Sequence, residues 1–550
     1  MPNSAAVFSA PPHLRTLAGA AFGATEGTIA RAPTGVTAFV GRTLKGPVNR
    51  AIAIASFGEF QQLFGGLWQP STVAYAIEQF FENGGRHAFV VRVVNGARPP
   101  TLTLRAGSEA LRLRGINPGS REFLRASVDY DGIAADETDL FNLVVQRLHA
   151  VPSEQIEDQE IFRRLSIATH AEHGINDALS ESHLVRVLGA PPPQRPDRSI
   201  RSPHAPVVDY VNSNPDGDDG AALTDYDVIG SALDGTGLFA LQAIEGFNLL
   251  CIPPLDREQD VGMSTLMIAA RFCRERHAML LVDPPAAWSC ARAALEALRS
   301  WPFRSENAVM YFPRLTALDR LRGRIETFAA SGAVAGMLAR LDETWPVWVA
   351  AQSEDAILRP GLRPATAVAD SERVHLAKAG VNTLLAVRAP ALPAVTACTL
   401  AAGGGVSSDW KYLSARRLAL FINASIERGT RWLAFEQNSH PAWKRAREQT
   451  EAFLDALDLE GAFAGSAPEE SYFVICDERV NTRDSIAQGK VKLLYGFALT
   501  HPCDFHASLV THQSGASQVR TVSANRQATS QRRLEWEIET SILRGITIGS

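Results

Sequence analysis

Apolar runs and amphipathic segments alternate between about residue 220 and residue 300. The runs GFNLLCIPP (246–254) and HAMLLVDPP (277–285) are short and mostly apolar, and both end in Pro-Pro. Such runs are typical of buried strands. Residues 263–276 and 291–300 instead place apolar residues at helical spacing. The alternation predicts α/β layering in this part of the chain.

Three further segments have the pattern of helices. Residues 71–85 present an apolar face and end at two glycines that suit a left-handed C-cap, and a buried strand follows at 86–94. Residues 409–430 are apolar over a wide face, which predicts burial on several sides. Residues 441–458 have a proline in the first turn and an apolar face formed by Trp443, Ala446, Thr450, Phe453, Leu454 and Leu457.

Residues 99–190 have a different pattern, with short strand-like runs at close spacing and then a Pro-rich connector at 188–206. The fold expected is therefore α/β (α+β) and multidomain, with an inserted, mostly β domain. The expected divisions are an N-terminal arm (1–32), the first part of the core (33–98), the inserted domain with its connector (99–200), a central α/β domain (201–385), a C-terminal domain (386–512) and a C-terminal extension (513–550).

Both ends of the chain are expected to be extended. Residues 1–32 are rich in Ala, Gly and Pro and nearly free of charge. Near the other end, apolar and polar residues alternate strictly after a polar stretch at 512–531, which predicts a strand on a flexible tether. This strand either folds back onto its own domain or adds to the sheet of another subunit. The candidate residues for a strand between subunits are the apolar ones of the alternation: Leu534, Trp536, Ile538 and Ile542.

Composition narrows the possible functions. A net charge of -5 gives no basic surface for nucleic acid. The six cysteines are far apart and form no C-x-x-C pair, which argues against zinc sites and disulfides. We expect no signal peptide, because the N-terminus lacks a basic region followed by an apolar core. We expect no membrane insertion, because no apolar run reaches about 18 residues.

The motifs that carry chemistry are weak in this sequence. The glycines at 403–405 lack the lysine of a phosphate loop, and the Asp-rich segment 212–221 lacks the final Glu of a calcium loop. Asp283 ends a predicted strand, where α/β enzymes place catalytic groups, but a structural role is expected. An enzyme that binds a phosphate-bearing ligand near Gly403–Gly405 stays open as an alternative.

The stretch FVICDERVNTRDSIAQGKVKLLYGFAL (473–499) holds several carboxylates around a cysteine. It is interpreted as two strands joined by a capped turn. Thr482 is the expected N-cap of a short helix. Asp484 lies near the positive N-terminal end of that helix, where its negative charge is favourable, and Gly489 ends the helix. Asp477 and Asn481 are expected to hold the turn.

Several blocks, collinear from about 34 to 510, resemble the contractile tail sheath family of phage tails, R-type pyocins and extracellular contractile injection systems. The blocks include TGVTAFVGRTLKGPVNR, FFENGGRHAFVVRV, ASGAVAGMLARLD and the 473–499 stretch. The residues that carry the resemblance, with an expected structural role, are Gly46, Pro47, Gly65, Gly84, Gly85, Arg92, Gly332, Gly336, Arg340, Asp342, Asp477, Asn481, Thr482 and Gly489. The block WKYLSARRLALFINASIERGTRWLAFEQN is similar to a long family helix followed by a strand.

The resemblance implies a structural protein without enzymatic activity or cofactor. Its subunits would polymerise helically around an inner tube, contract, and contact baseplate and terminal cap proteins. Assembly would take place in the bacterial cytoplasm, in a phage tail or a particle released from the cell. The tube-facing candidates are Lys444, Arg445, Arg447 and Glu448. A baseplate or cap protein with the same fold is a second alternative.

Overall fold

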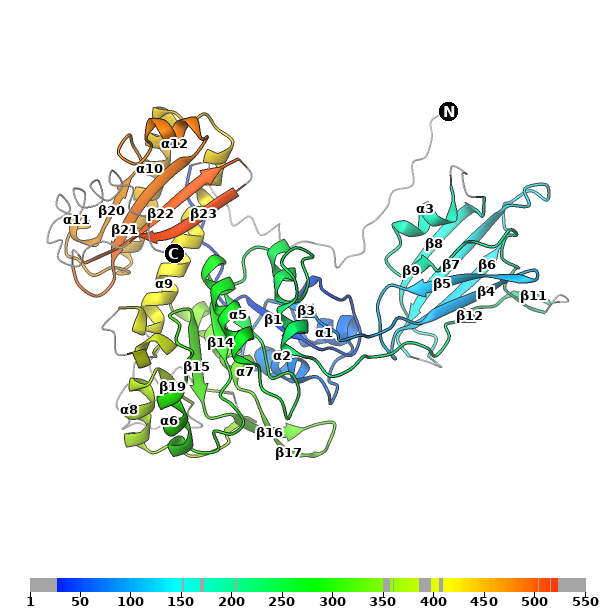
Figure 1. Cartoon of the computed structure of the whole chain (residues 1–550), viewed down its shortest axis with the longest axis horizontal. Coiled ribbons are helices and arrows are strands. Elements are labelled where there is room, and N and C mark those ends of the chain that lie inside the picture. Colours follow the sequence, from blue (N-terminus) through cyan, green and yellow to red (C-terminus); the bar gives the residue numbers. More distant parts are fainter. Residues whose placement is uncertain are drawn as a thin grey trace.

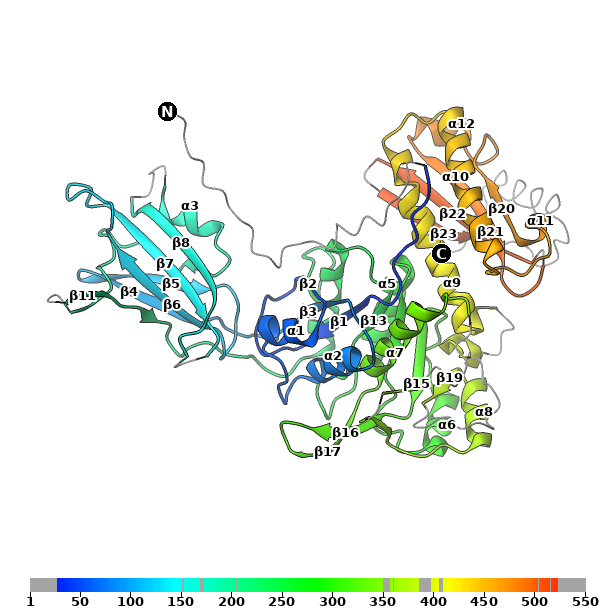
Figure 2. The ribbon, with the colours of Figure 1, turned by 180° about the vertical axis from the view of Figure 1, so that it is seen from behind.

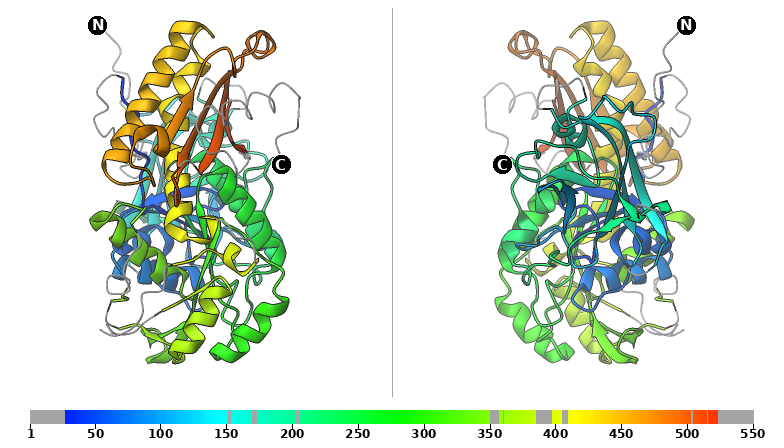
Figure 3. Two further views of the ribbon diagram at one scale, coloured as in Figure 1. Left: turned by 90° about the vertical axis from the view of Figure 1, so that its left-hand side faces the viewer. Right: turned by 90° about the vertical axis from the view of Figure 1, so that its right-hand side faces the viewer.

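The computed structural model describes residues 27–522 except 151–152, 169–172, 203–204, 350–356, 360, 385–396, 405–408, 503 and 515. Figure 1 shows a central α/β domain, a β domain beside it, and a C-terminal domain reached through one long helix, α9 (Leu413–Gly429). Figure 3 shows the same stacking from the two sides, with the C-terminal domain above the α/β domain in both views.

A seven-stranded sheet forms the centre of the α/β domain. Its order is β19-β15-β14-β13-β1-β3-β2, and only the β2–β3 pair is antiparallel. Every residue of β1, β3, β13, β14 and β15 is buried, since helices cover both faces, and this explains the unbroken apolar runs. The strands are β1 (Thr37–Gly41), β2 (Ala51–Ile54), β3 (Ala88–Arg92), β13 (Leu249–Cys251), β14 (Met279–Val282), β15 (Ala308–Phe312) and β19 (Val381–Thr383).

Helices cover the two faces of this sheet. One face packs against α1 (Phe57–Phe64), α2 (Thr72–Glu82) and α7 (Ser331–Thr344). The other packs against α4 (Asp225–Ile229), the 3-10 helix η2 (Gly237–Ala243), α5 (Met263–Glu275), α6 (Ala291–Ser300) and α8 (Asp370–Lys378). The predicted α/β layering and the helices expected at 71–85, 263–276 and 291–300 are confirmed.

The inserted β domain follows β3. Its sheets have the orders β12-β6-β7-β8, β4-β5-β9 and β10-β11, and α3 (Ile175–Ser180) lies beside them. In β4 and β5 every second residue is buried, because one face packs on the shared core. The strands are β4 (Thr101–Ala106), β5 (Glu109–Gly115), β6 (Phe123–Asp129), β7 (Leu140–Leu148), β8 (Ile156–Ser166), β9 (Val185–Val187), β10 (Ile200–Ser202), β11 (Ala205–Val208) and β12 (Val211–Asn212). Since β12 pairs with β6, the domain extends beyond residue 200.

A hairpin protrudes from the α/β domain between β15 and α7. Its strands β16 (Leu315–Asp319) and β17 (Arg324–Phe328) pair antiparallel, and β18 (Arg363–Pro364) adds to β16. Figure 1 shows the hairpin at the lower edge of the domain.

The C-terminal domain packs α9 and α10 (His440–Leu459) against an antiparallel sheet of order β20-β21-β22-β23. The first part of α9 contributes Leu413 and Leu420 to the core of the α/β domain, and its later residues enter the core of the C-terminal domain. The predicted burial of this helix on several sides is confirmed. The remaining elements are η3 (Leu400–Gly404), η4 (Asp409–Lys411), α11 (Pro468–Ser471), β20 (Tyr472–Ile475), α12 (Arg483–Ala487), β21 (Val491–Ala498), β22 (Phe505–Gln513) and β23 (Ala516–Val522).

The structure corrects three expectations. The segment after α9 forms a 3-10 helix, η5 (Arg431–Ala434), and no strand, because its chain turns back at once toward α10. The polar stretch expected to be a tether begins as strand β23, which is outermost in its sheet among the described residues and tolerates polar side chains there. Residues 27–32, expected to be part of an unpacked arm, lie along α9 (Figure 2). Ile29 and Ala32 of this segment are buried in the core of the C-terminal domain.

Candidate assembly surfaces

The glycines of the block at 331–342 lie where α7 crosses α2. A Cβ at Gly332 would lie well inside 3.0 Å of the Ala76 carbonyl oxygen, and one at Gly336 equally close to that of Phe80. Real Cβ atoms essentially never approach a neighbour this closely. The spacing of four residues places both glycines on one face of α7, so that the two helix backbones touch.

The charged residues of the same block join elements together. Arg340 donates to the carbonyl oxygens of Asn83, at 3.1 Å, and of Ile357, at 2.6 Å. Gly84, with φ 108°, packs against the side chain of Arg340. Asp342 pairs with Arg417 in a buried contact that ties α7 to α9. This pair is one of the joints between the α/β domain and the helix of the C-terminal domain.

Three more motif glycines also hold local structure. Gly85 leaves room for the ring of Phe80, because a Cβ at position 85 would overlap the ring atoms. Gly65, with φ 88°, is the left-handed C-cap of α1. Gly46, with φ 105°, packs on the end of α1, next to the half-buried Pro47.

Arg92 lies at the root of the inserted domain. It is almost completely buried, and its Nη1 donates to the Gly46 carbonyl oxygen at 2.6 Å. Burial lowers the pKa of Arg92 to about 10. The glycine of the next loop, Gly119, lies close to this guanidinium. Arg92 therefore holds together the loops through which the inserted domain leaves the sheet.

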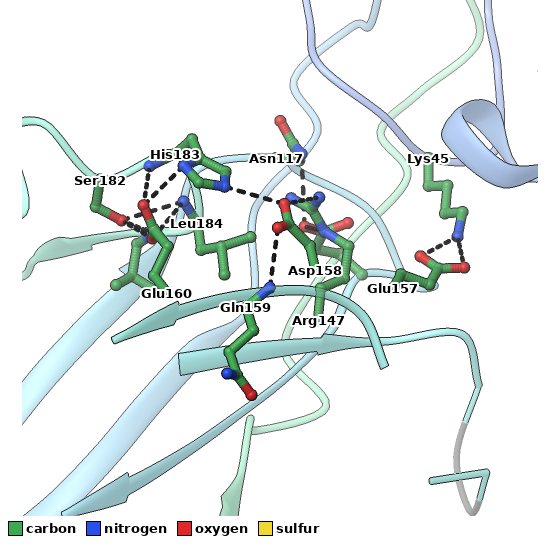
Figure 4. Close-up of polar contacts among 12 residues, drawn as sticks. Lys45, Asn117, Arg147, Glu157, Asp158, Gln159, Glu160, Ser182, His183 and Leu184 are labelled. Atoms are coloured by element: carbon green, nitrogen blue, oxygen red, sulfur yellow. Dashed lines mark hydrogen bonds and ion pairs between the residues drawn. The ribbon is translucent and has the colours of Figure 1, made fainter. Parts of the chain in front are cut away.

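A polar network continues from this root into the inserted domain (Figure 4). Lys45 of the α/β domain pairs with both carboxylate oxygens of Glu157 at 2.6 Å, and both side chains are largely buried. On the same strand, Asp158 and Glu160 bind the His183 ring at 3.0 and 2.7 Å. Hydrogen bonds that the His183 ring donates to these two carboxylates raise its pKa to about 9. The sequence analysis did not identify this network, although three acidic residues, Glu157, Asp158 and Glu160, lie within four positions of a strand.

The stretch at 473–499 forms the two strands and capped turn that the sequence predicts. Thr482 is the N-cap of α12, its hydroxyl accepting from the Ser485 N–H, and Gly489 follows the helix with φ 65°. Asn481 is buried and bonds both backbone groups of Lys492, donating at 2.9 Å and accepting at 2.7 Å. The Asn481 side chain thus adds one more pair of hydrogen bonds to those that join β20 and β21. Asp477 binds Arg479 at 2.7 Å.

The C-terminal sheet ends in two outer strands, β20 and β23. The described chain begins and ends at this domain. At its start, Ala32 donates its N–H to the Ser425 hydroxyl on α9 and Arg31 pairs with Glu460, and at its end lies β23. The terminal strand candidates Leu534, Trp536, Ile538 and Ile542 lie outside the described residues.

The tube-facing candidates lie on α10, whose apolar face packs on α9 and the sheet. Lys444, Arg445 and Glu448 are exposed, and Arg447 is half-buried. Lys444 pairs with Glu448 and Arg447 with Glu451, each four residues on. Arg445 instead pairs with Glu436, before the helix, at 3.1 Å, so the exposed face of α10 carries mixed charge that is largely paired.

The positions considered for chemistry have structural partners. Asp283 accepts from the N–H groups of Ala330 and Ser331 at 2.8 Å and caps α7. In the Asp-rich segment, Asp216 binds Thr101 and Asp219 binds Ser120, so these carboxylates fasten the linker to the inserted domain. Gly403 packs against the Ala379 carbonyl group at the end of α8.

Two searches of the described residues give negative results. No group of three or more His, Cys, Asp or Glu side chains among them is placed to hold a metal ion. None of the helices in the described ranges combines the length and apolar character needed to cross a membrane.

No family model matches the sequence, and neither does any curated protein. Solved structures do match over nearly the whole chain. A sheath tail protein from Listeria innocua is 12% identical, with a TM-score of 0.57 over 89% of this chain and 97% of that one. The sheath of the extracellular contractile injection system PVC, in its contracted state, is 16% identical, with a TM-score of 0.50 over 87% and 91%. A chain of the contracted anti-feeding prophage baseplate is 18% identical, with a TM-score of 0.50 over 89% and 97%.

Proposed function

We propose that this chain, which has the fold of contractile sheath proteins, is a sheath subunit that polymerises helically around an inner tube and contracts. One observation carries the proposal: the fold agrees with a sheath tail protein over 89% of this chain and 97% of the other. The agreement includes the inserted and C-terminal domains, so it exceeds the likeness of one common α/β unit. A helical rod requires heterologous contacts between copies, since such contacts do not close into a dimer.

The test is assembly with an inner-tube protein of a contractile particle. The two purified proteins are mixed and imaged by negative stain. Rods of regular width are expected, and their cross-section should show this chain outside the tube. Monomers in every condition, with the tube present, would exclude the proposal.

The C-terminal domain is where neighbouring copies would be linked. Both ends of the described chain leave from it, and its outer strands β20 and β23 present backbone groups that another strand can pair with. The segment that contains Leu534, Trp536, Ile538 and Ile542 alternates as such a strand must. Deleting 530–550 should leave a folded monomer and impair rod formation; rods that form unchanged would show that the segment has no such role.

The tube contact is proposed for the exposed face of α10, with the inserted domain on the outside of the rod. The candidates are Lys444, Arg445, Arg447 and Glu448, of which three are basic. Reversing Lys444 and Arg445 to Glu should abolish binding to the tube while the chain stays folded, because both side chains are exposed. Equal tube binding by this variant and by the unaltered chain would place the contact elsewhere.

Two alternatives have distinct outcomes. A baseplate protein of the same fold is suggested by the match to a baseplate chain, and it would occur in few copies instead of forming long rods. An enzyme that binds a phosphate-bearing ligand near Gly403–Gly405 would be stabilised by nucleotides in a thermal shift scan.

A further inference from the structure

A histidine near the end of strand β22 is buried where three elements of the C-terminal domain meet. His512 is completely buried, although it lies only one residue from the end of its strand. Its Nε2 is 2.8 Å from the hydroxyl of Thr430, the residue that follows α9. Its Nδ1 is 2.8 Å from the hydroxyl of Ser517 on β23. The ring therefore links the hairpin β22–β23 to the helix that joins the two domains.

The hydrogen bonds of Thr430 determine which ring nitrogen of His512 carries the hydrogen. Thr430 donates its only hydroxyl hydrogen to the Ile426 carbonyl oxygen, at 2.6 Å. Its oxygen can then only accept from the ring, so Nε2 carries the hydrogen and Nδ1 accepts from the Ser517 hydroxyl. The neutral imidazole is thus fully hydrogen-bonded, as a buried polar group requires.

The charged groups around His512 do not pair with the ring. Among the contacts of the described residues, His512 bonds two hydroxyl groups and no carboxylate. Glu427 of α9 and Arg431 of η5 act on it with opposite sign. Glu427 is already engaged by His277 at 2.9 Å and by Arg431 at 3.7 Å. The residues opposite His512 in β21 and β23 are uncharged. Burial therefore dominates and lowers the pKa of His512 to about 4.

A cavity of about 150 Å³ lies next to this position, between the C-terminal and α/β domains. Ser517, Glu427 and Arg431 form one side of it, and Glu245 and Arg276 of the α/β domain line the other. Arg431 pairs with Glu245 across the cavity. Because Ser517 forms part of the wall, a movement of β23 at this residue would expose Nδ1 of His512 to water.

We propose that His512 is an acid-sensitive switch, and that its protonation releases the hairpin β22–β23 from the end of α9. When β23 moves away, Nδ1 meets water and takes up a proton. The charged ring is then disfavoured in a buried site whose hydrogen-bond partners are two hydroxyl groups. Acid thus loosens the last strand of the described chain. The proposal concerns the chain by itself and does not rest on the proposed function.

The direction of the pH effect follows from the two states of the hairpin. In the released hairpin the pKa of His512 returns to its ordinary value near 6.5, whereas in the closed hairpin it is about 4. The closed state is therefore fully favoured above pH 6.5, and its advantage is lost as the pH falls toward 4. Between pH 7 and pH 5 the population of the released hairpin should rise about twentyfold.

Hydrogen exchange of the purified chain, without a tube protein, tests the switch. Exchange is measured by mass spectrometry at pH 7 and pH 5 and corrected for the pH dependence of exchange in an unstructured peptide. The protection of β22 and β23 should fall about twentyfold, while that of β13 and β14 in the α/β domain stays unchanged. Equal protection of the hairpin at both pH values, or an equal loss in β13 and β14, would overturn the proposal.

Two histidine variants separate the effect of His512 from that of other groups. His512→Gln removes the titratable ring but keeps a hydrogen-bond donor and an acceptor, so the hairpin should be equally protected at pH 7 and pH 5. His501→Gln, at an exposed position of the same domain, is the matched control and should keep the whole change. A change that persists in His512→Gln would assign it to another group and refute the switch. If this variant does not fold, the measurement on the unaltered chain still decides.

Discussion

Replacing Gly332 by alanine tests whether the glycines of the block at 331–342 serve to bring α2 and α7 into backbone contact. In an uncrowded helix this change is favourable by about 1 kcal/mol, because alanine loses less backbone entropy than glycine. Here the added methyl group meets the Ala76 carbonyl oxygen of α2 well inside 3.0 Å. A backbone atom within a hydrogen-bonded helix cannot rotate away as a side chain can, so the helices must separate.

The net effect follows from these two opposing terms. Overpacking a core costs about 1–3 kcal/mol, and the rigid neighbour places Gly332→Ala near the upper end of that range. After the gain in helix propensity, about 2 kcal/mol of destabilisation remains. For a unit of 150–250 residues this corresponds to a fall in Tm of about 4–8 °C.

The matched control is Gly58→Ala in α1. Gly58 is exposed, and a Cβ there has only the Ser56 hydroxyl nearby, at 3.7 Å. This variant should gain up to about 1 kcal/mol. Thermal unfolding of both variants is followed by circular dichroism, and changes of opposite sign are expected. If Gly332→Ala is as stable as Gly58→Ala, the helix crossing has room for a methyl group and the packing explanation of the block is wrong.

Three further changes probe the other joints. Asn481→Ala should destabilise the C-terminal domain by about 2 kcal/mol, because it removes a buried amide together with both of its hydrogen bonds to the Lys492 backbone, and urea unfolding measures this. Arg417→Met should cost about 3–5 kcal/mol by leaving Asp342 buried and unpaired, and adding Asp342→Leu should recover most of it. The pKa of His183 is raised to about 9, above its unfolded value near 6.5, so its contribution to stability is complete below pH 6.5 and lost as the pH rises through 9. The stability difference between the unaltered chain and His183→Gln should therefore shrink over that interval; a constant difference would contradict it.

Elements with strong periodicity were predictable from the sequence. Helices α9 and α10 could be predicted without tertiary information, α9 from its wide apolar face and α10 from the proline in its first turn. Both helices are present in the structure. The turn at 482–489 was equally local, since a threonine N-cap and a glycine after the helix fix it within eight residues.

Features that depend on distant contacts were not predictable. The strand β23 has a polar sequence and forms because β22 offers an unpaired edge. Ile29 lies in a nearly uncharged segment that resembles a free arm in the sequence. It packs on α9 because Gly429, which has no side chain, leaves room for it, and this contact is visible only in the structure. The hairpin β16–β17 was missed, although the alternation in 315–319 and the glycine at 323 are hairpin signals.

The placement of the glycines and charged residues discussed above bears on how the chain would move if it contracts as proposed. Gly332 and Gly336 bring α7 onto α2, Asp342 ties α7 to α9, and Arg92 holds the root of the inserted domain. All of these positions are buried joints inside one chain, and none lies on the surfaces proposed for contact between copies. Tightly packed joints favour movement of the subunit as a rigid body. In a sheath subunit of the kind proposed, the free energy released on contraction would then come from contacts between subunits, which is where substitutions at the sheet edges are expected to act.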